Sequence, residues 1–123
     1  MLTIPPSTRI YLASQPIDMR KGFPGLLAVI GDAWKQDPYS GHLFVFVGKR
    51  KDRVKILFWD GNGFALYYKL LERGRFQMPD TRGQQVKLEP AELSMLLSGI
   101  DLHRARLPKW RPRQTAIDAG DGS

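Results

Sequence analysis

Carboxylate side chains are the groups in this sequence that could carry out metal-dependent cleavage of a phosphodiester. Nucleases hold two Mg²⁺ ions with acidic residues, and the acidic residues that could do so here are Asp18, Asp60, Asp80 and Glu89. Asp60, however, begins the segment DGNG, which has the composition of a tight hairpin turn. Asp18 is placed to cap a short helical turn. Turn and cap roles explain these two side chains better than catalysis does, so we predict that the chain is not an enzyme.

Residues that bind zinc or nucleotides are sparse. The sequence has no cysteine and two histidines, His42 and His103, which are far apart and show no ligand spacing. The glycine-rich segments GFPG and DGNG lack the Lys-Ser/Thr pair of a phosphate-binding loop. We therefore expect structural or surface roles for both histidines, with no metal and no cofactor.

Positive charge is the most unusual property of the sequence. Its 123 residues include 19 Lys and Arg against 12 Asp and Glu, a formal net charge of +7. Residues 42–76 carry eight basic and three acidic side chains, and residues 104–123 carry five basic and two acidic. This distribution favours a polyanionic partner. The predicted nucleic-acid-binding residues are Lys49, Arg50, Lys51, Arg53, Lys55, Lys69, Arg73, Arg75, Arg104, Arg106, Lys109, Trp110, Arg111 and Arg113.

The elements that must position these side chains are indicated by apolar periodicity and turn residues. Short apolar segments bounded by turns predict strands at 9–13, 42–47, 53–60, 64–71 and 84–88. Helical spacing after Pro24 predicts a helix over about 24–36, ended by Asp37-Pro38. A second, short helix begins at Pro90, with Gly99 near its end. Asn-Gly and Gly-Asn in DGNG supply the positive φ angles of a primed hairpin turn.

Alternation along the 53–60 strand divides its side chains between two faces. Val54, Ile56 and Phe58 form the better candidate for the core, whereas Arg53 and Lys55 share the other face with Trp59. Two interpretations of that second face remain open. Its aromatic residues could pack beneath a helix while the cations reach water at the rim, or Trp59 and Tyr68 could stack nucleic-acid bases beside bound phosphates.

Together these elements predict a single-domain α+β fold. We expect a mainly antiparallel sheet of about four to five strands, with the 24–36 helix packed on one face and a second short helix. The expected domain covers residues 1–103, and residues 104–123 form a basic tail whose composition predicts flexibility. The predicted core includes Leu27, Ile30, Trp34, Phe44, Phe46, Ile56, Phe58 and Leu96.

Long segments of the sequence resemble a known family. PIDMRKGFPGL, LFVFVGKRKDRVKILFWDGNGFALYYKLLERGRFQMP and LEPAELSMLLSGID occur in that order between about Ile10 and Leu102. They resemble the accessory protein of bacterial insertion sequences of the sixty-six class, the Orf2-like TnpB family. That family is unrelated to the RNA-guided nucleases that share the label TnpB. The resemblance implies a role in DNA transposition beside a separate, larger transposase, and it supplies no catalytic residue.

Two functional hypotheses follow. The chain is either a DNA-binding accessory factor, with the element ends as the expected DNA, or a protein-interaction module that docks on the transposase without touching nucleic acid. A homo-oligomer is a further option. The N-terminal segment MLTIPPSTR lacks the pattern of a secretion signal. The longest apolar run, 43–47, is too short to span a bilayer. We therefore expect a cytoplasmic protein with no membrane partner.

Overall fold

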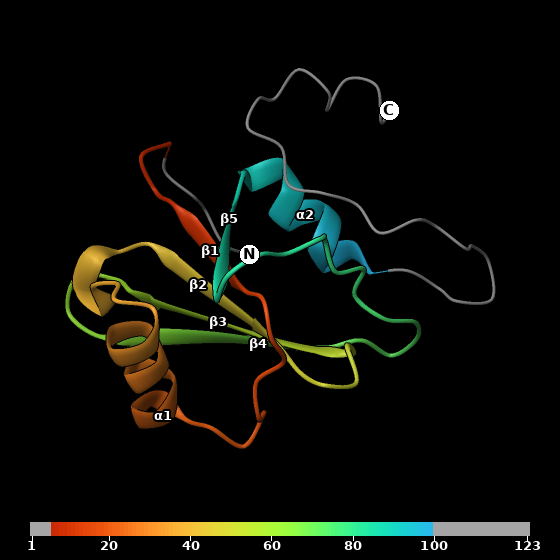
Figure 1. Ribbon diagram of the computed structural model, residues 1–123, viewed down its shortest axis with the longest axis horizontal. Helices are drawn as coiled ribbons and strands as arrows, with labels where there is room; N and C mark the ends of the chain where they lie inside the picture. Colours follow the sequence, from red (N-terminus) through yellow and green to blue (C-terminus); the bar gives the residue numbers. More distant parts are fainter. Residues whose placement is uncertain (1–5, 100–123) are drawn as a thin grey trace.

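Three apolar runs joined by two short turns make the centre and one edge of a five-stranded sheet. The computed structural model describes residues 6–99. Strands β2 (Leu43–Val47), β3 (Arg53–Trp59) and β4 (Phe64–Leu70) follow one another as antiparallel neighbours. β1 (Ile10–Ala13) lies parallel to β2, and β5 (Gln85–Leu88) lies antiparallel to β1. The sheet order is β4-β3-β2-β1-β5 (Figure 1), so the α+β prediction with a mainly antiparallel sheet is confirmed.

The helix between β1 and β2 is shorter and less regular than predicted. α1 (Phe23–Ala28) begins with a proline in its first turn and continues into a π-helix over Val29–Ala33. The amide of Trp34 donates to the carbonyl of Val29, five residues back, at 3.0 Å. Lys35 then takes a left-handed conformation with φ of 57°, which ends the helical segment before the predicted stop at Asp37-Pro38.

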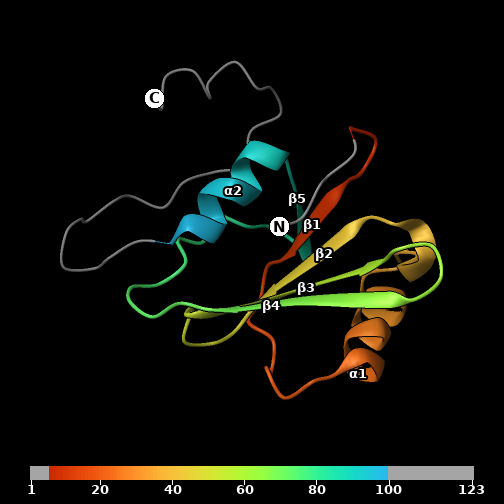
Figure 2. The same ribbon diagram turned by 180° about the vertical axis from the view of Figure 1, so that it is seen from behind.

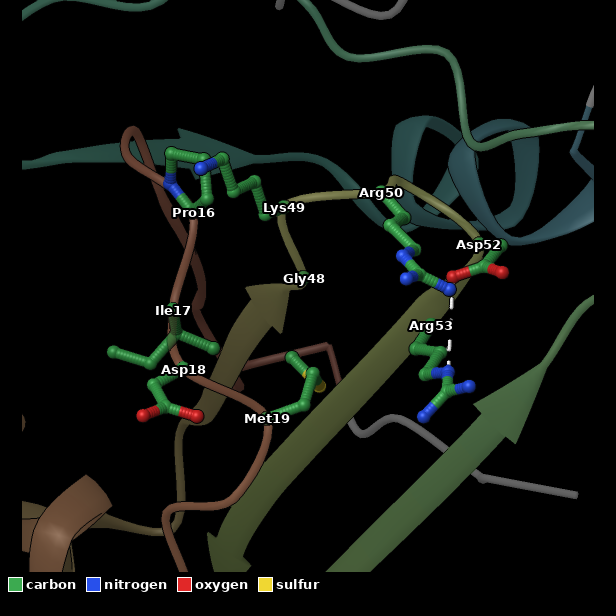
Figure 3. A pocket seen from close by; sticks show the side chains of 9 residues that line it. All are labelled: Pro16, Ile17, Asp18, Met19, Gly48, Lys49, Arg50, Asp52 and Arg53. Atoms are coloured by element: carbon green, nitrogen blue, oxygen red, sulfur yellow. Dashed lines mark ion pairs between the residues drawn. The ribbon is translucent and has the colours of Figure 1, made fainter.

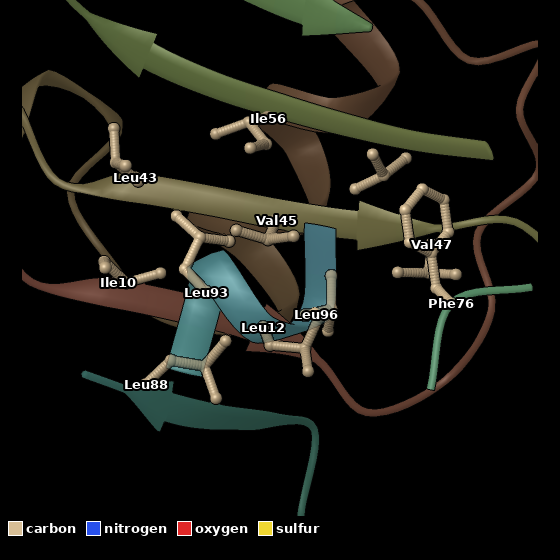
Figure 4. Close-up of a cluster of buried hydrophobic side chains, with 11 residues drawn as sticks. Ile10, Leu12, Leu43, Val45, Val47, Ile56, Phe76, Leu88, Leu93 and Leu96 are labelled. Carbon is tan, nitrogen blue, oxygen red and sulfur yellow. The ribbon is translucent and has the colours of Figure 1, made fainter. Parts of the chain in front are cut away.

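Helices cover both faces of the sheet. Figures 1 and 2 show α1 on one side of the strands and α2 (Pro90–Ser98) on the other. On the α2 face, Leu93 and Leu96 pack onto side chains from four strands (Figure 4), which include Ile10, Leu12, Val45, Ile56 and Leu88. On the α1 face the buried residues are Ala13, Leu26, Ile30, Trp34, Phe44, Phe46 and Leu57. Neither face of β2 meets solvent, so every residue of this strand is buried.

The predicted core is confirmed for six of its eight residues. Ile30, Trp34, Phe44, Phe46, Ile56 and Leu96 are buried, with 0–7% of each exposed. Leu27 and Phe58 are only partly buried and pack against the margins of the two clusters. The expectation of one main helix on one face was incomplete, because α2 closes the opposite face.

Capping residues fix the ends of α2. The Glu89 side chain accepts from the backbone at Glu92, and the Glu92 carboxylate accepts from the Glu89 amide at 2.7 Å, a reciprocal capping box. At the other end Gly99 has a φ of 71°, a conformation that favours glycine. Within residues 6–99, no helix is long and apolar enough to cross a membrane.

The β3–β4 turn forms where predicted, with a positive φ at one of its central residues. The Asp60 amide donates to the Gly63 carbonyl at 2.9 Å, and the Asp60 carboxylate accepts from the amides of Asn62 and Gly63. Of the two central residues, Gly61 has a positive φ (114°) and Asn62 does not. This excludes the doubly positive type I′ turn and fits a type II′ arrangement, in which glycine comes first. Asp60 thus has the turn role that its position indicated.

Candidate nucleic-acid interface

The turn between β2 and β3 carries the densest group of cations. Its backbone is closed by two hydrogen bonds, from Lys51 N to Gly48 O at 2.9 Å and from Gly48 N to Arg53 O at 3.0 Å. Lys51 adopts a left-handed conformation with φ of 62°. Lys49 and Arg50 are exposed, whereas Lys51 and Arg53 are partly exposed. The turn therefore presents adjacent positive groups to solvent from a fixed backbone.

A second segment locks this turn in place. The Leu71 amide donates to Asp52 O at 2.8 Å, and the Phe76 amide donates to Lys51 O at 2.6 Å. The Phe76 side chain is buried in the α2-face core. Arg75, which is exposed, is thereby held beside the turn although it lies more than twenty residues along the chain.

Two adjoining depressions surround the turn. One, of about 620 Å³, is lined by Pro16, Ile17, Asp18, Met19, Gly48, Lys49, Arg50, Asp52 and Arg53 (Figure 3). The other, of about 750 Å³, is lined by Lys49, Arg50, Lys51, Asp52, Gly74 and Arg75. We call the combined lining the basic concavity. It contains five basic and two acidic side chains, a net formal charge of +3.

The first depression has a wall that sequence reasoning missed. Ile17 N donates to Val47 O at 3.1 Å, which extends β2 by one parallel bridge between Ile17 and Gly48. Met19 lies directly against Gly48, where an added Cβ would come within 2.8 Å of Met19 Cγ. Gly48 was the one local signal of this close approach, since a glycine is needed where another segment meets the backbone. The contacts themselves join residues too distant in sequence for periodicity to reveal.

The carboxylates of the concavity are both engaged with arginine. Asp18 accepts from the Arg20 guanidinium at 2.8 and 3.0 Å and from the Arg20 amide at 2.9 Å. These hydrogen bonds lower the pKa of Asp18 to about 2, so it stays ionised at neutral pH. Asp52 Oδ1 lies 3.7 Å from Arg53 Nε, the ion pair drawn in Figure 3. Asp18 therefore stabilises a local turn, in keeping with its expected capping role.

Two of the predicted phosphate contacts, Lys55 and Lys69, have hydrogen-bond partners within the fold. Lys55 is 8% exposed, and its ammonium donates to Met19 O at 2.7 Å and to Lys21 O at 2.9 Å. Lys69 donates to Leu97 O at 2.9 Å, next to the end of α2. Alternation placed Lys55 on the correct face, but residues 17–21 cover that face. Each ammonium therefore already has a carbonyl partner, and Lys55 is too buried to reach water at the rim as one interpretation expected.

The two candidate stacking residues, Trp59 and Tyr68, lie at different distances from the basic concavity. Trp59 is half-buried and packs edge-on against Tyr39 and Phe64, with ring centroids 5.1 and 5.0 Å away. It pairs with Phe64 at the far end of the hairpin, whereas Arg53 pairs with Leu70 at the near end. Trp59 lies six residue steps along the strand from Arg53, roughly 20 Å. Tyr68 is 51% exposed and lies closer, with the Lys55 ammonium 5.2 Å from its ring.

Of the remaining predicted residues, the structure describes only Arg73, which does not line the concavity. Arg73 is exposed in the segment after β4 and belongs to neither depression. The tail residues lie outside the described part of the chain: Arg104, Arg106, Lys109, Trp110, Arg111 and Arg113. His42 is at the opposite end of β2 from the turn. Its Nδ1 accepts from the Arg9 amide at 2.9 Å, which is the structural role expected of it. Among residues 6–99, no three His, Asp or Glu side chains gather as a metal site would require.

Comparison with known proteins adds a family and two relatives. The family described as IS66 Orf2 like protein matches residues 8–107. Two uncharacterized proteins of Sinorhizobium fredii are similar over most of both chains. One, y4jC, is 43% identical over 109 residues, which cover 88% of this chain and 93% of the relative. The other, y4hO, is 40% identical over 112 residues, which cover 91% and 96%. No solved structure matches.

Proposed function

Since the chain belongs to the IS66 Orf2-like family and is a transposition-associated accessory protein, we propose that it binds DNA through the backbone phosphates and does not cleave it. The observation that carries this proposal is the basic concavity. Side chains from the β2–β3 turn converge there with Arg75 from a separate segment. Cations gathered on a concave surface attract a phosphodiester backbone and release its condensed counterions.

The contacts available in the concavity are of the kind that position DNA. Lys49, Arg50, Lys51 and Arg75 end in ammonium or guanidinium groups, which bind phosphate oxygens irrespective of base sequence. In residues 6–99 the cations lie on a turn and a loop, with no helix among them to enter a major groove. The proposed role is therefore to hold or bridge DNA, while sequence selection belongs to another component. The cations of the 104–123 tail are proposed as additional contacts on the basis of their charge alone.

Non-catalytic action is supported by the carboxylates already described. Asp60 caps the β3–β4 turn and Asp18 is bound to Arg20, so each has a structural hydrogen-bonding role. Purified protein should neither nick nor join DNA in the presence of Mg²⁺ or Mn²⁺. Metal-dependent cleavage that Asp60→Asn or Asp80→Asn abolishes, with the fold intact, would contradict this part of the proposal.

A second candidate function is docking on the transposase. The observation that favours it is the pair of exposed apolar side chains on β4, Tyr68 and Leu70, which are 51% and 58% exposed. A pull-down with the transposase of the same element separates the two candidates. DNA binding is supported if the transposase retains this protein only at low salt and only when terminal-repeat DNA is present. Retention at high salt without DNA supports the docking module.

A further inference from the structure

Within residues 6–99, the backbone groups of β4 that have no partner lie on alternate residues. Hydrogen bonds from Leu71 N to Asp52 O and from Asp60 N to Gly63 O flank its ladder with β3. Because hydrogen-bonded and non-bonded pairs alternate in an antiparallel ladder, the register identifies the residues whose N–H and C=O groups point away from β3. They are Phe64, Leu66, Tyr68 and Leu70. Among residues 6–99 only β3 pairs with β4, which lies at the margin of the sheet in Figure 2.

This edge lacks the features that usually keep an edge strand from pairing. Proteins protect such edges with prolines, bulges or charged side chains. β4 has no proline, and its seven residues stay in register with β3 without a bulge. Its one charged side chain, Lys69, is turned onto the carbonyl of Leu97. The outward-bonding residues all carry apolar or aromatic side chains, and Tyr68 and Leu70 are exposed.

We propose that β4 pairs antiparallel with β4 of a second copy, which makes a symmetric dimer with one sheet continuous across both copies. A two-fold axis at Tyr67 aligns the free groups of both edges. It sets Leu66 opposite Tyr68 of the second copy, and Phe64 opposite Leu70 of the second copy. Apolar and aromatic cross-strand pairs of this kind stabilise a sheet. The interface is isologous, as in most homodimers.

Charge and exposure favour a second copy as the occupant. The same register places Lys69 opposite Ala65, so the two positive side chains do not face each other. Leu70, 58% exposed, would be covered by Phe64 of the other copy. That Phe64 packs against Tyr39, which is 60% exposed and would gain a neighbour as well. The exposed end of one strand, Leu70, is therefore covered by the partly buried end, Phe64, of the other. This inference does not rest on DNA binding, because it uses none of the cations of the basic concavity.

Sedimentation with a matched pair of substitutions tests the dimer. Seven paired residues make a small interface, so the full-length protein is examined at high concentration as well as low. Leu70→Lys places a charge on the edge, while Met95→Lys places the same charge on α2, where Met95 is 50% exposed. We expect concentration-dependent dimers for the wild type and for Met95→Lys, and a monomer for Leu70→Lys. A wild type that stays monomeric, or equal dissociation by both substitutions, would overturn the proposal.

Disulfide trapping tests the register. The chain contains no cysteine, so any covalent dimer reports the introduced residue. Residue 67 faces itself across the axis as a non-bonded pair, with Cα atoms about 4.5 Å apart, within reach of a disulfide. Mild oxidation should link Tyr67→Cys into dimers and leave Met95→Cys largely monomeric. Equal linking of both would overturn the register. If the wild type is monomeric and Leu70→Lys abolishes its binding to the transposase, the edge is instead the transposase-binding site. This conclusion holds whether or not the protein binds DNA.

Discussion

The ammonium group of Lys55 lies 2.7 Å from the carbonyl oxygen of Met19, and this hydrogen bond ties the wall of the basic concavity to the centre of the sheet. A second bond to Lys21 O, at 2.9 Å, holds the same segment. Lysine is rarely buried without a partner, and here the two carbonyls supply one. Lys55 is thus a positioning residue: it sets the shape of the surface that other cations present.

Replacement of Lys55 by methionine should destabilise the fold. Methionine keeps much of the apolar stem but leaves the Met19 and Lys21 carbonyls without their donor, a loss of about 1–3 kcal/mol. Urea unfolding measures this change. Lys49→Met is the matched control, because Lys49 is exposed and such surface substitutions change stability by about 0.5 kcal/mol or less. Equal stability of both variants would show that the two hydrogen bonds do not anchor residues 17–21.

Gly48→Ala should reveal the contact between the turn and Met19. The added Cβ would lie 2.8 Å from Met19 Cγ, and overpacking of this kind costs about 1–3 kcal/mol. The same substitution at Gly31, where an added Cβ meets nothing within 4 Å, should be neutral or slightly stabilising. In a double-mutant cycle, Met19→Ala should relieve part of the loss at Gly48. Strict additivity of the two substitutions would contradict the contact.

The stability of the fold should decrease in mild acid because of His42. Burial, together with the nearby positive charges of Arg9 and Lys87, lowers the pKa of His42 below its ordinary value of 6.5. The unfolded chain therefore takes up this proton at a higher pH than the folded chain does. His42 contributes its full stability above the unfolded pKa and loses it progressively as pH falls from that value through the lower folded pKa.

Unfolding by urea at about pH 7.5 and about pH 5, on either side of the ordinary histidine pKa, measures this effect. His42→Asn keeps a side-chain acceptor for the Arg9 amide but cannot titrate, so it should lose less stability between the two conditions. Both proteins retain His103, so the difference isolates His42. Parallel losses in the two proteins would contradict the lowered pKa.

Local patterns in the sequence predicted the hairpins, and tertiary contacts decided the rest. The turn at 60–63 and the alternation in β3 depend on neighbouring residues, and both were predicted. The hydrogen bonds of Lys55 were not predicted, because the carbonyls that accept them lie more than thirty residues away in the sequence. In the same way, charge composition identified the cations of the β2–β3 turn, but their wall formed by residues 16–19 depends on packing against Gly48. The coverage of both sheet faces likewise depends on long-range packing of α2.

Trp59→Ala should act on stability and leave nucleic-acid affinity unchanged. Trp59 is half-buried between Tyr39 and Phe64, and its removal should cost about 2 kcal/mol, less than the loss of a fully buried ring. Binding of single-stranded DNA by the folded variant should match the wild type, since Trp59 lies far from the basic concavity. A loss of about 1–3 kcal/mol in single-strand affinity with unaltered stability would restore the stacking hypothesis.

The salt dependence of duplex DNA binding tests the central claim most directly. If four to six cations engage phosphates, the slope of log K against log salt should be about −4 to −5. Reversal of Lys49, Arg50 and Lys51 to Glu should make the slope shallower by about 2–3 and weaken binding similarly for all DNA sequences. The matched control reverses Arg9, Lys35 and Lys87, exposed cations that line neither depression, so net charge changes equally. We predict that the wild-type slope is near −4 to −5 and that the control variant largely retains this slope. Undetectable binding at low salt, or an equal loss in both triple variants, would contradict phosphate binding by the basic concavity.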